Sequence, residues 1–339
     1  MTREDRTFII AEAGVNHNGS LGIAKRLVDA AKSCGADAVK FQTFKVERLV
    51  TPDAGKADYQ KRSTGAETSQ LGMLKKLELK DEDFGKLLAH CRHCGIEFLS
   101  SPFDEESADL LDALGMATFK IPSGEITNHP LLRHIARKRK PVILSTGMCM
   151  LGEVEEAVGI FRIAATPRLV LLHCVSEYPA PYDQINLSAM TTLRTAFGLE
   201  VGYSDHTLGV EIPVAAVSLG ATLIEKHFTL DTGMEGPDHK ASLNPVEFRA
   251  MVQAIRNVER SLGDGIKRPA PCELGNMAVV RKSIVAAAPI AQGEVISREK
   301  LAVKRPGNGI QPKELEKLVG LRAARAIAKD EVLKWQDLA

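Results

Sequence analysis

Eight short apolar runs, most of them separated by longer segments with helical periodicity, constrain the fold of this chain more than any other feature. The predicted strands span residues 8–13, 38–43, 96–101, 118–121, 142–145, 169–174, 200–203 and 222–228. Helical patterns include residues 21–34, which Ser20 is placed to cap, residues 187–195, and a final pattern at 246–262. Eight such units, near the typical length of about 250 residues, predict an α/β fold of the TIM (β/α)8 barrel type.

The composition and the hydrophobic periodicity of the sequence change after residue 262. Residues 263–276 (GDGIKRPAPCELGN) are rich in Gly and Pro, and we expect a linker over 263–280. Short β-like runs and the polar turn at 304–309 then predict a small β-rich domain over 281–339, with little room for a core of its own. The predicted domains are therefore a barrel at 1–262, the linker, and this small domain.

The connection from residue 45 to residue 80 is far longer than an ordinary loop of a compact domain. It carries mixed charges together with Pro52, Gly55 and Gly65. Long connections of this kind are usually functional, so we expect this segment to form part of the mouth of a binding site.

Composition excludes several classes of protein. The chain has 339 residues, of which 26% are charged and 44% hydrophobic, and its formal net charge is +1. This balance is typical of a soluble globular protein and gives no electrostatic case for nucleic-acid binding. No apolar run has the 18 to 20 residues, roughly, that a membrane helix needs. We therefore expect a cytoplasmic protein with no nucleic-acid or membrane partner.

Six cysteines are scattered through the sequence, and without secretory features they are expected to be reduced thiols. The one suggestive pattern is Cys91-Arg92-His93-Cys94, which has the spacing of half a zinc site or of a redox pair. No second pair at zinc spacing follows, and the pattern ends an amphipathic run at 83–94. Core or surface thiols are the favoured interpretation.

Reactive side chains stand at the C-terminal ends of nearly all the predicted strands, where TIM barrels place their active sites. They are Glu12, Lys40, Gln42, Lys120, Ser123, Glu125, Ser145, Ser176, Tyr178, Ser204, His206, Glu225 and His227. For any single residue, a functional role and an ordinary polar residue at a solvated strand end are equally good interpretations. Their presence on almost every strand favours one shared site.

The residue types indicate the ligand. Two lysines, several serines and glycine turns suit a small polyanion, such as a phosphate or a phosphocarboxylate. His206 and His227 end neighbouring strands and are predicted to bind one divalent ion, with positions left open for water or substrate.

Two carboxylates have two interpretations. Glu12 and Glu125 are candidates for proton transfer or for positioning water. The alternative is that they neutralise Lys40 and Lys120 in a buried ion-pair network.

Seven stretches along the barrel closely resemble the N-acetylneuraminate (sialic acid) synthase family, which includes the legionaminic and pseudaminic acid synthases. They are AEAGVNHNG (11–19), VKFQTF (39–44), FKIPSGE (119–125), LSTGM (144–148), GYSDH (202–206), IEKHF (224–228) and GPDH (236–239). The tail adds KRPGNGI (304–310), which is similar to the family's antifreeze-like SAF domain, a β-clip fold. The resemblance implies a barrel whose SAF domain is swapped across a homodimer and covers the partner's active site.

The resemblance also implies roles for individual residues. Those on phosphoenolpyruvate-binding positions are Lys40, Lys120, Ser123, Ser145, Ser176 and Ser204. His206 and His227 fall on the metal ligands, usually for Mn²⁺, with Mg²⁺ or Co²⁺ as alternatives. The positions that contact the acylated sugar are Gln42, Tyr178, Asp238 and, from the partner's tail, Arg305.

The implied enzyme is a transferase that condenses phosphoenolpyruvate with an N-acyl amino sugar and water, giving a nine-carbon 2-keto acid and phosphate. Glu125 would activate or orient the water that adds at C2, and Glu12 would act as a supporting acid or base near the metal. Ser176 stands where some neuraminate synthases have Asn, which leaves N-acetylmannosamine and 2,4-diacetamido-2,4,6-trideoxymannose both open as substrates. The products would be N-acetylneuraminate and N,N'-diacetyllegionaminate respectively.

Two other classes remain as alternatives. One is another synthase that condenses phosphoenolpyruvate with an aldose, which would need a second phosphate-binding cluster for a phosphorylated sugar. The other is a non-catalytic carbohydrate-binding protein, against which the full set of polar strand ends argues.

Overall fold

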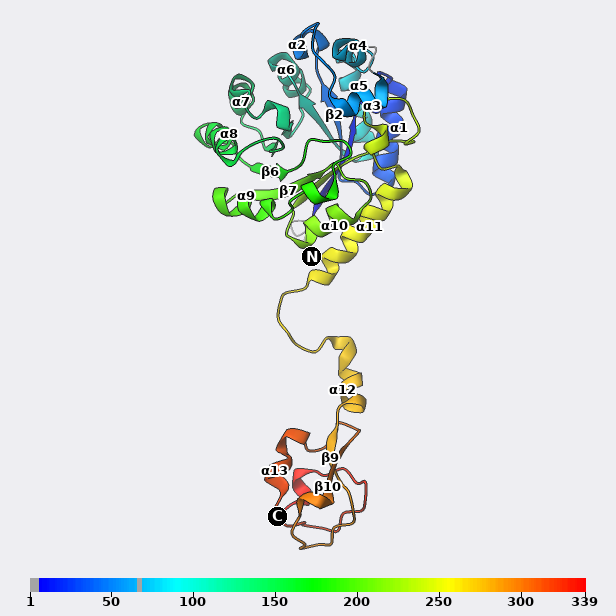
Figure 1. Ribbon diagram of the computed structural model, residues 1–339, viewed down its shortest axis with the longest axis vertical. Coiled ribbons are helices and arrows are strands. Elements are labelled where there is room, and N and C mark those ends of the chain that lie inside the picture. Colours follow the sequence, from blue (N-terminus) through cyan, green and yellow to red (C-terminus); the bar gives the residue numbers. More distant parts are fainter. Residues whose placement is uncertain (1–5, 66–68) are drawn as a thin grey trace. The chain divides into compact units, whose positions relative to one another are not determined.

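The computed structural model describes residues 6–65 and 69–339 and divides the chain into two compact units, one ending at Gly263 and one beginning at Asp264. In the first unit, eight parallel strands are surrounded by helices (Figure 1). The strands are β1 (Phe8–Gly14), β2 (Ala38–Thr43), β3 (Glu97–Pro102), β4 (Phe119–Ile121), β5 (Val142–Ser145), β6 (Leu169–His173), β7 (Glu200–Asp205) and β8 (Leu223–His227). The TIM barrel predicted from the sequence is confirmed.

The strands pair in the order β3-β2-β1-β8-β7-β6-β5-β4, and β3 lies against β4, so the barrel is nearly closed. The predicted strand bounds agree with the structure to within two residues at every end. The largest shortfall is at the end of β7, where Ser204 and Asp205 continue the strand. Both polar residues are buried: Ser204 bonds to Glu225 inside the barrel, and Asp205 on the other face of the strand pairs with Lys226, so an apolar run could not indicate them.

The helices of the first unit are α1 (Leu21–Ser33), α2 (Val46–Leu49), α3 (Asp58–Thr64), α4 (Gln70–Lys75), α5 (Asp81–Cys94), α6 (Glu105–Ala113), α7 (His129–Ala136), α8 (Leu151–Ile163), α9 (Ala189–Phe197), α10 (Glu211–Ser218) and α11 (Pro245–Leu262). Ser20 caps α1 as predicted, because its hydroxyl accepts a hydrogen bond from the Ile23 amide. Gly95 ends α5 in the left-handed conformation, at φ +66°. None of the described helices is long and apolar enough to cross a membrane.

Side-chain alternation along the strands builds the barrel interior in layers. An apolar layer inside the barrel includes Ile10, Ala38 and Leu223. Successive side chains of a strand point to opposite faces, so residues two positions further along face inward as well. That rule brings Glu12, Lys40 and Glu225 into the next layer, nearer the C-terminal ends of the strands. A larger apolar core fills the space between strands and helices.

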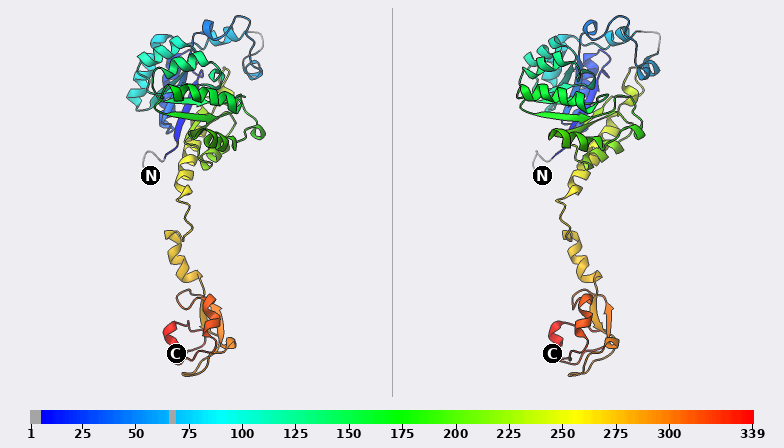
Figure 2. Two further views of the ribbon diagram at one scale, coloured as in Figure 1. Left: turned by 90° about the vertical axis from the view of Figure 1, so that its left-hand side faces the viewer. Right: turned by 60° about the vertical axis from the view of Figure 1, so that its left-hand side comes forward.

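The connection between β2 and α5 contains the short helices α2, α3 and α4, and Figure 2 shows it over one end of the barrel. An apolar cluster that includes Val15, Phe44 and Met73 packs this segment against the loop after β1. The approach is close at Gly19, which has φ +70° and where a Cβ would stand 2.5 Å from the Lys76 carbonyl oxygen. The predicted long loop is thus a folded segment.

The second unit contains the antiparallel strands β9 (Ser283–Ala286) and β10 (Leu301–Lys304), together with helices α12 (Leu274–Val280) and α13 (Leu315–Leu318). Isolated bridges such as Ile290 to Ile327 extend the β structure, and eleven buried apolar residues form a core. The segment predicted as a linker, residues 263–280, contains α12. The prolines of that segment precede residue 274, so they do not interrupt the helix.

Candidate active site

Four charged side chains meet inside the barrel, and each is at most 4% exposed. Lys40 Nζ lies 2.6 Å from Glu12 Oε2 and 3.7 Å from Glu225 Oε2. Lys120 Nζ lies 3.3 Å from Glu225 Oε1. We call Glu12, Lys40, Lys120 and Glu225 the central cluster. Strands β1, β2, β4 and β8 each supply one member, so the closed barrel is what brings the four together.

The surroundings of Glu12 and Glu225 shift the pKa values of the two carboxyl groups in opposite directions. Burial raises the pKa of Glu12 to about 7, although the Lys40 ammonium opposes the shift. Burial acts the same way on Glu225, but Lys120 and Lys40 outweigh it and hold its pKa below the ordinary value. One carboxyl group can therefore take up a proton near neutral pH while the other stays ionised. When Glu12 is protonated the cluster loses a negative charge, which favours an anionic ligand.

Hydroxyl groups extend the central cluster. Lys120 Nζ donates to Ser145 Oγ over 2.8 Å, and Ser204 Oγ donates to Glu225 Oε1 over 2.7 Å. Both serines are buried. The predicted phosphoenolpyruvate residues Lys40, Lys120, Ser145 and Ser204 thus belong to one network of hydrogen bonds and ion pairs.

Ser123 and Ser176 converge on Gly147. The Gly147 amide donates to Ser123 Oγ over 2.9 Å, and a Cβ at Gly147 would stand 2.5 Å from Ser176 Oγ. The Cys174 thiol completes this group, because its Sγ lies 3.1 Å from Ser123 Oγ. Gly147 therefore has no room for a side chain where the two hydroxyls and the thiol meet.

His206 and His227 lie with their ring centroids 5.4 Å apart. His206 Nδ1 is hydrogen-bonded to the Val175 carbonyl oxygen at 2.5 Å, so the lone pair of the neutral ring is on Nε2, which lies 3.5 Å from Ser204 Oγ. The Nδ1 of His227 is buried without a hydrogen-bond partner. Burial lowers the pKa of His206 to about 4, and burial and then His206 lower that of His227 well below its ordinary value. Both rings are therefore neutral, as metal coordination requires.

A buried ion pair supports the turn that carries His206. Lys226 Nζ is paired with Asp205, and neither side chain is exposed at all. Asp205 Oδ1 also accepts hydrogen bonds from the Thr207 amide at 3.1 Å and from its hydroxyl at 2.9 Å. Lys226 and Asp205 thereby fix the backbone on both sides of the histidine.

The residues predicted to contact a sugar border this site. The Tyr178 ring lies 4.2 Å from His206 and 5.3 Å from His227, and on its other side 4.9 Å from Tyr59 of α3. Gln42 Nε2 donates to Glu12 Oε1 over 3.4 Å. Asp238 is buried, which raises its pKa to about 6, and its charge acts on both Tyr59 and Tyr178.

The contacts described above include neither of two other predicted residues, Glu125 and Arg305. Glu125 is half-buried, and its Oε2 accepts a hydrogen bond of 2.7 Å from Asn128 at the start of α7. Arg305 belongs to the second unit, in the turn after β10. The roles predicted for both stay predictions.

Sequence reasoning missed roles for Glu225 and Cys174. The sequence indicates Glu225 as a strand-end residue but not its position between the two lysines, and it indicates Cys174 only as one of six scattered thiols. Strand alternation was the available signal, because Glu225 follows the inward Leu223 by two positions and Cys174 likewise follows Leu172.

A cavity of about 870 Å³ opens at the opposite end of the barrel, where the strands begin. Its floor is the apolar layer that includes Leu99, Ile143 and Leu223, and its rim carries Glu97 and Arg168. The N-terminal end of a TIM barrel serves stability, so we place the candidate site at the central cluster despite the size of this cavity.

Comparison with known proteins shows the family to which the chain belongs. The NeuB family model matches residues 27–267, and a SAF domain model matches residues 281–339. The chain belongs to the NeuB family. It is 50% identical to the N,N'-diacetyllegionaminic acid synthase of Campylobacter jejuni subsp. jejuni serotype O:2, over 97% of this chain and 99% of that protein. It is also 50% identical to the synthase of the same name from Legionella pneumophila, over 98% of this chain and 94% of that one.

A solved structure of the same family supports the fold. The N-acetylneuraminic acid synthetase of Leptospira borgpetersenii, in complex with citrate, is similar with a TM-score of 0.71 and 35% identity, over 80% of this chain and 90% of that one. The curated relatives include these two legionaminic acid synthases and a pseudaminic acid synthase of Campylobacter jejuni, which are synthases of nonulosonic acids. The chain is accordingly an enzyme of the phosphoenolpyruvate-dependent transferase type.

Proposed function

We propose that this NeuB family enzyme condenses phosphoenolpyruvate with 2,4-diacetamido-2,4,6-trideoxymannose and water to give N,N'-diacetyllegionaminate and phosphate. The observation that carries the choice of sugar is the identity of 50% with two N,N'-diacetyllegionaminic acid synthases over nearly the full length of each. Identity with the N-acetylneuraminic acid synthetase of Leptospira borgpetersenii is lower, at 35%. N-acetylmannosamine is therefore the second candidate. Six free thiols favour a reducing compartment, which supports a cytoplasmic reaction.

Phosphoenolpyruvate is proposed to bind at the central cluster. Lys40 and Lys120 supply positive charge in a site that excludes water, and the hydroxyls of Ser145 and Ser204 are already held by hydrogen bonds. Ser123 and Ser176 supply further hydroxyls beside the Gly147 amide. A phosphate and a carboxylate group of one ligand can divide these donors between them.

A divalent metal is proposed to bind His206 and His227, with Mn²⁺ as the first choice and Mg²⁺ or Co²⁺ as alternatives. The two neutral rings, and a buried His227 nitrogen that lacks a hydrogen-bond partner, fit such a ligand set. When bound, the metal would polarise the aldehyde oxygen of the open-chain sugar.

The reaction joins C3 of phosphoenolpyruvate to C1 of the aldehyde, water adds at C2, and the bond from C2 to the phosphate oxygen breaks. Glu12, whose burial allows it to hold a proton near neutral pH, is proposed to protonate the new alkoxide. Glu125 is proposed to orient the water. The ammonium and hydroxyl groups of the site hold the phosphate until it leaves.

The sugar is proposed to bind between Gln42, Tyr178 and Asp238. Tyr178 connects the two histidines to α3, so a sugar that contacts it also lies near the metal ligands. Arg305 is proposed to reach the acyl group from the SAF domain of the partner in a domain-swapped homodimer.

The test is phosphate release from phosphoenolpyruvate by metal-stripped protein with and without Mn²⁺, comparing the two sugars. We expect metal-dependent release with preference for 2,4-diacetamido-2,4,6-trideoxymannose. Preference for N-acetylmannosamine would make the chain a neuraminate synthase. Release only with a phosphorylated aldose would replace the proposal by the other class of phosphoenolpyruvate-aldose synthase.

A matched control isolates the metal. His206→Ala is expected to abolish the metal-stimulated release, whereas His134→Ala, on the outer helix α7, is expected to retain it. Full activity in the His206→Ala enzyme would remove the metal assignment.

A further inference from the structure

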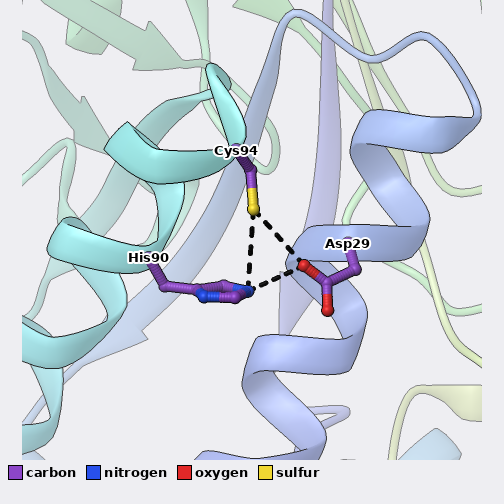
Figure 3. Close-up of side chains that lie close together, drawn as sticks. All are labelled: Asp29, His90 and Cys94. Carbon is purple, nitrogen blue, oxygen red and sulfur yellow. Dashed lines mark hydrogen bonds and ion pairs between the residues drawn. The ribbon is translucent and has the colours of Figure 1, made fainter.

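A second set of metal-ligating side chains lies on the outer helices of the barrel. Within residues 6–65 and 69–339, Asp29, His90 and Cys94 form the one group of three His, Cys, Asp or Glu residues whose ligand atoms all lie within 4.8 Å of one another (Figure 3). Asp29 belongs to α1 and the other two to α5. His90 and Cys94 are four residues apart, so they share a helix face, and that face is turned toward Asp29.

The distances between the three ligand atoms approach those of a tetrahedral zinc site. Zinc binds imidazole nitrogen or carboxylate oxygen at about 2.1 Å and thiolate sulfur at about 2.3 Å, so tetrahedral ligand atoms stand about 3.3 to 3.6 Å apart. Here Cys94 Sγ lies 3.7 Å from His90 Nε2 and 3.4 Å from Asp29 Oδ1. The third distance, from His90 Nε2 to Asp29 Oδ1, is 2.7 Å. A small rotation of the exposed Asp29 side chain would lengthen the distance from His90 Nε2 to Asp29 Oδ1.

We propose that Asp29, His90 and Cys94 bind one zinc ion, with water as the fourth ligand. Imidazole, thiolate and carboxylate together are a zinc-type ligand set, which a hard cation such as Mg²⁺ does not prefer. The thiolate and the carboxylate balance the two positive charges of the ion. The site therefore differs in chemistry from the pair His206 and His227, which contains no sulfur.

Binding exchanges protons for the metal. In the empty site the Cys94 thiol and the His90 ring are both hydrogen-bonded to Asp29. Zinc binding releases the thiol proton to solvent and requires the neutral tautomer of His90 with its proton on Nδ1. Burial and then Asp29 raise the pKa of the Cys94 thiol, and the nearby Lys32 ammonium opposes the shift. Cys91 does not compete, because it is buried and its pKa is raised to about 12.

The ion would join α1 to α5, two neighbouring helices of the outer layer that otherwise pack through apolar side chains such as Leu27 and Leu87. A ligand that binds the folded chain and not the unfolded one stabilises the fold. Zinc is thus expected to raise the melting temperature of the wild-type protein without being required for phosphate release.

Cobalt spectroscopy of the metal-free, full-length chain tests the site. Co²⁺ bound to a thiolate gives a sulfur-to-cobalt charge-transfer absorption in the near ultraviolet, and ligation by His206 and His227 alone would not. We expect this absorption to saturate at one ion per chain, to disappear when Zn²⁺ displaces the cobalt, and to be absent in Cys94→Ser. The matched control is Cys272→Ser, which removes an exposed thiol outside the cluster and is expected to keep the absorption.

The other two ligands have their own tests. His90→Ala and Asp29→Ala are each expected to weaken Co²⁺ binding by about 100-fold or more, while circular dichroism shows an unchanged fold. A wild-type chain without the sulfur absorption, or an absorption that survives Cys94→Ser, would overturn the proposal. Unchanged affinity in both other variants would do the same, because it would leave a single thiol that binds metal adventitiously.

Discussion

Gly147 illustrates at the scale of one residue how tightly the proposed phosphoenolpyruvate site is built. A methyl group there would stand 2.5 Å from Ser176 Oγ and 2.9 Å from both Ser123 Oγ and Cys174 Sγ. All three groups would have to move. Since misplacement of binding groups by about 1 Å can cost about 100-fold in rate, we expect Gly147→Ala to lower kcat/KM for phosphoenolpyruvate by about that factor.

The control for this prediction is Gly159→Ala on α8, where an added Cβ meets nothing within 4 Å. Alanine is the better helix former by about 1 kcal/mol, so this variant is expected to keep its activity and unfold at slightly higher temperature. Steady-state kinetics with phosphoenolpyruvate varied would measure both variants. Equal activity of the two would contradict the proposed role of the Ser123, Ser176 and Cys174 group.

Asp238 makes the proposed sugar site sensitive to pH. Burial raises its pKa from 3.8 to about 6, so the carboxylate predominates above pH 6 and the acid form below it. A carboxylate accepts hydrogen bonds from sugar hydroxyl and amide groups more strongly than the acid does. We expect the KM for the sugar to rise about tenfold per unit as pH falls below 6, and to be flat in Asp238→Asn. A wild-type KM without this rise would contradict the assignment.

The same shift predicts a cost in stability. A carboxyl group with a raised pKa in the folded state destabilises the fold at pH values above that pKa, and the cost disappears below the unfolded value. Two pKa units correspond to about 3 kcal/mol as an upper limit. Asp238→Asn should therefore raise the melting temperature at pH 7.5 and leave it unchanged near pH 3.5. Thermal unfolding at the two pH values measures the difference, and an equal shift at both would point to packing instead.

Strand alternation explains which site residues could be predicted from the sequence. Lys40 and Lys120 are predictable because polar side chains inside apolar strands are conspicuous, and Ser145 and Ser204 because they end strands. The ion pair of Lys40 with Glu12, which the sequence analysis gives as the alternative role of Glu12, joins register partners on neighbouring strands. The contacts of Lys40 and Lys120 with Glu225 are not predicted, because they depend on barrel closure. Glu125 shows most clearly what the sequence does not predict. Its position at the end of the stretch FKIPSGE (119–125) does not indicate its hydrogen bond to Asn128.

At the scale of elements, helix α3 covers part of the proposed sugar site. Tyr59 packs on Tyr178, and Arg62 pairs with Glu177 at 2.7 Å, so two contacts connect α3 to the loop after β6. The ion pair is exposed and contributes about 0 to 1 kcal/mol. The aromatic contact is the more important one, because Tyr178 in turn packs on both histidines.

Tyr59→Ala should therefore raise the KM for the sugar by about tenfold, the equivalent of one aromatic pair, and leave the KM for phosphoenolpyruvate unchanged. Tyr59→Phe keeps the ring and serves as the control. Kinetics with each substrate varied in turn would separate the two constants. A parallel rise in both would mean that α3 supports the whole barrel mouth and not the sugar alone.

Helices and strands are predictable where a single hydrophobic periodicity, helical or strand-like, runs through the segment. The bounds of strand β2 are predicted without error, because the run that forms it is clearly set off from the residues on either side. The segment from residue 45 to residue 80 was not resolved into α2, α3 and α4, since each has at most seven residues and packs by long-range contacts such as Val46 with Met73. Helices that short carry too few turns for a periodic signal.

At the scale of the whole molecule, each of the two compact units has an apolar core of its own. A chain ending at Gly263 is therefore expected to remain folded, because the barrel core needs nothing from the second unit. The proposed role of Arg305 predicts that this truncated chain loses condensation activity. Circular dichroism and phosphate release together test both statements, and an active truncated monomer would contradict the proposed swapped SAF domain.

Complementation between two inactive variants decides whether the SAF domain acts on its own barrel or on its partner's. Arg305→Ala damages the tail and His206→Ala damages the barrel, so each variant alone should be inactive. In a mixed dimer with swapped domains, the intact barrel of the Arg305→Ala chain receives the intact tail of the His206→Ala chain. One of the two sites is then complete, and about half of the wild-type activity should return. The mixed dimer can be isolated by coexpressing the two chains with different affinity tags. If each tail served its own barrel, neither site would be complete, and the mixed dimer would stay as inactive as its parents.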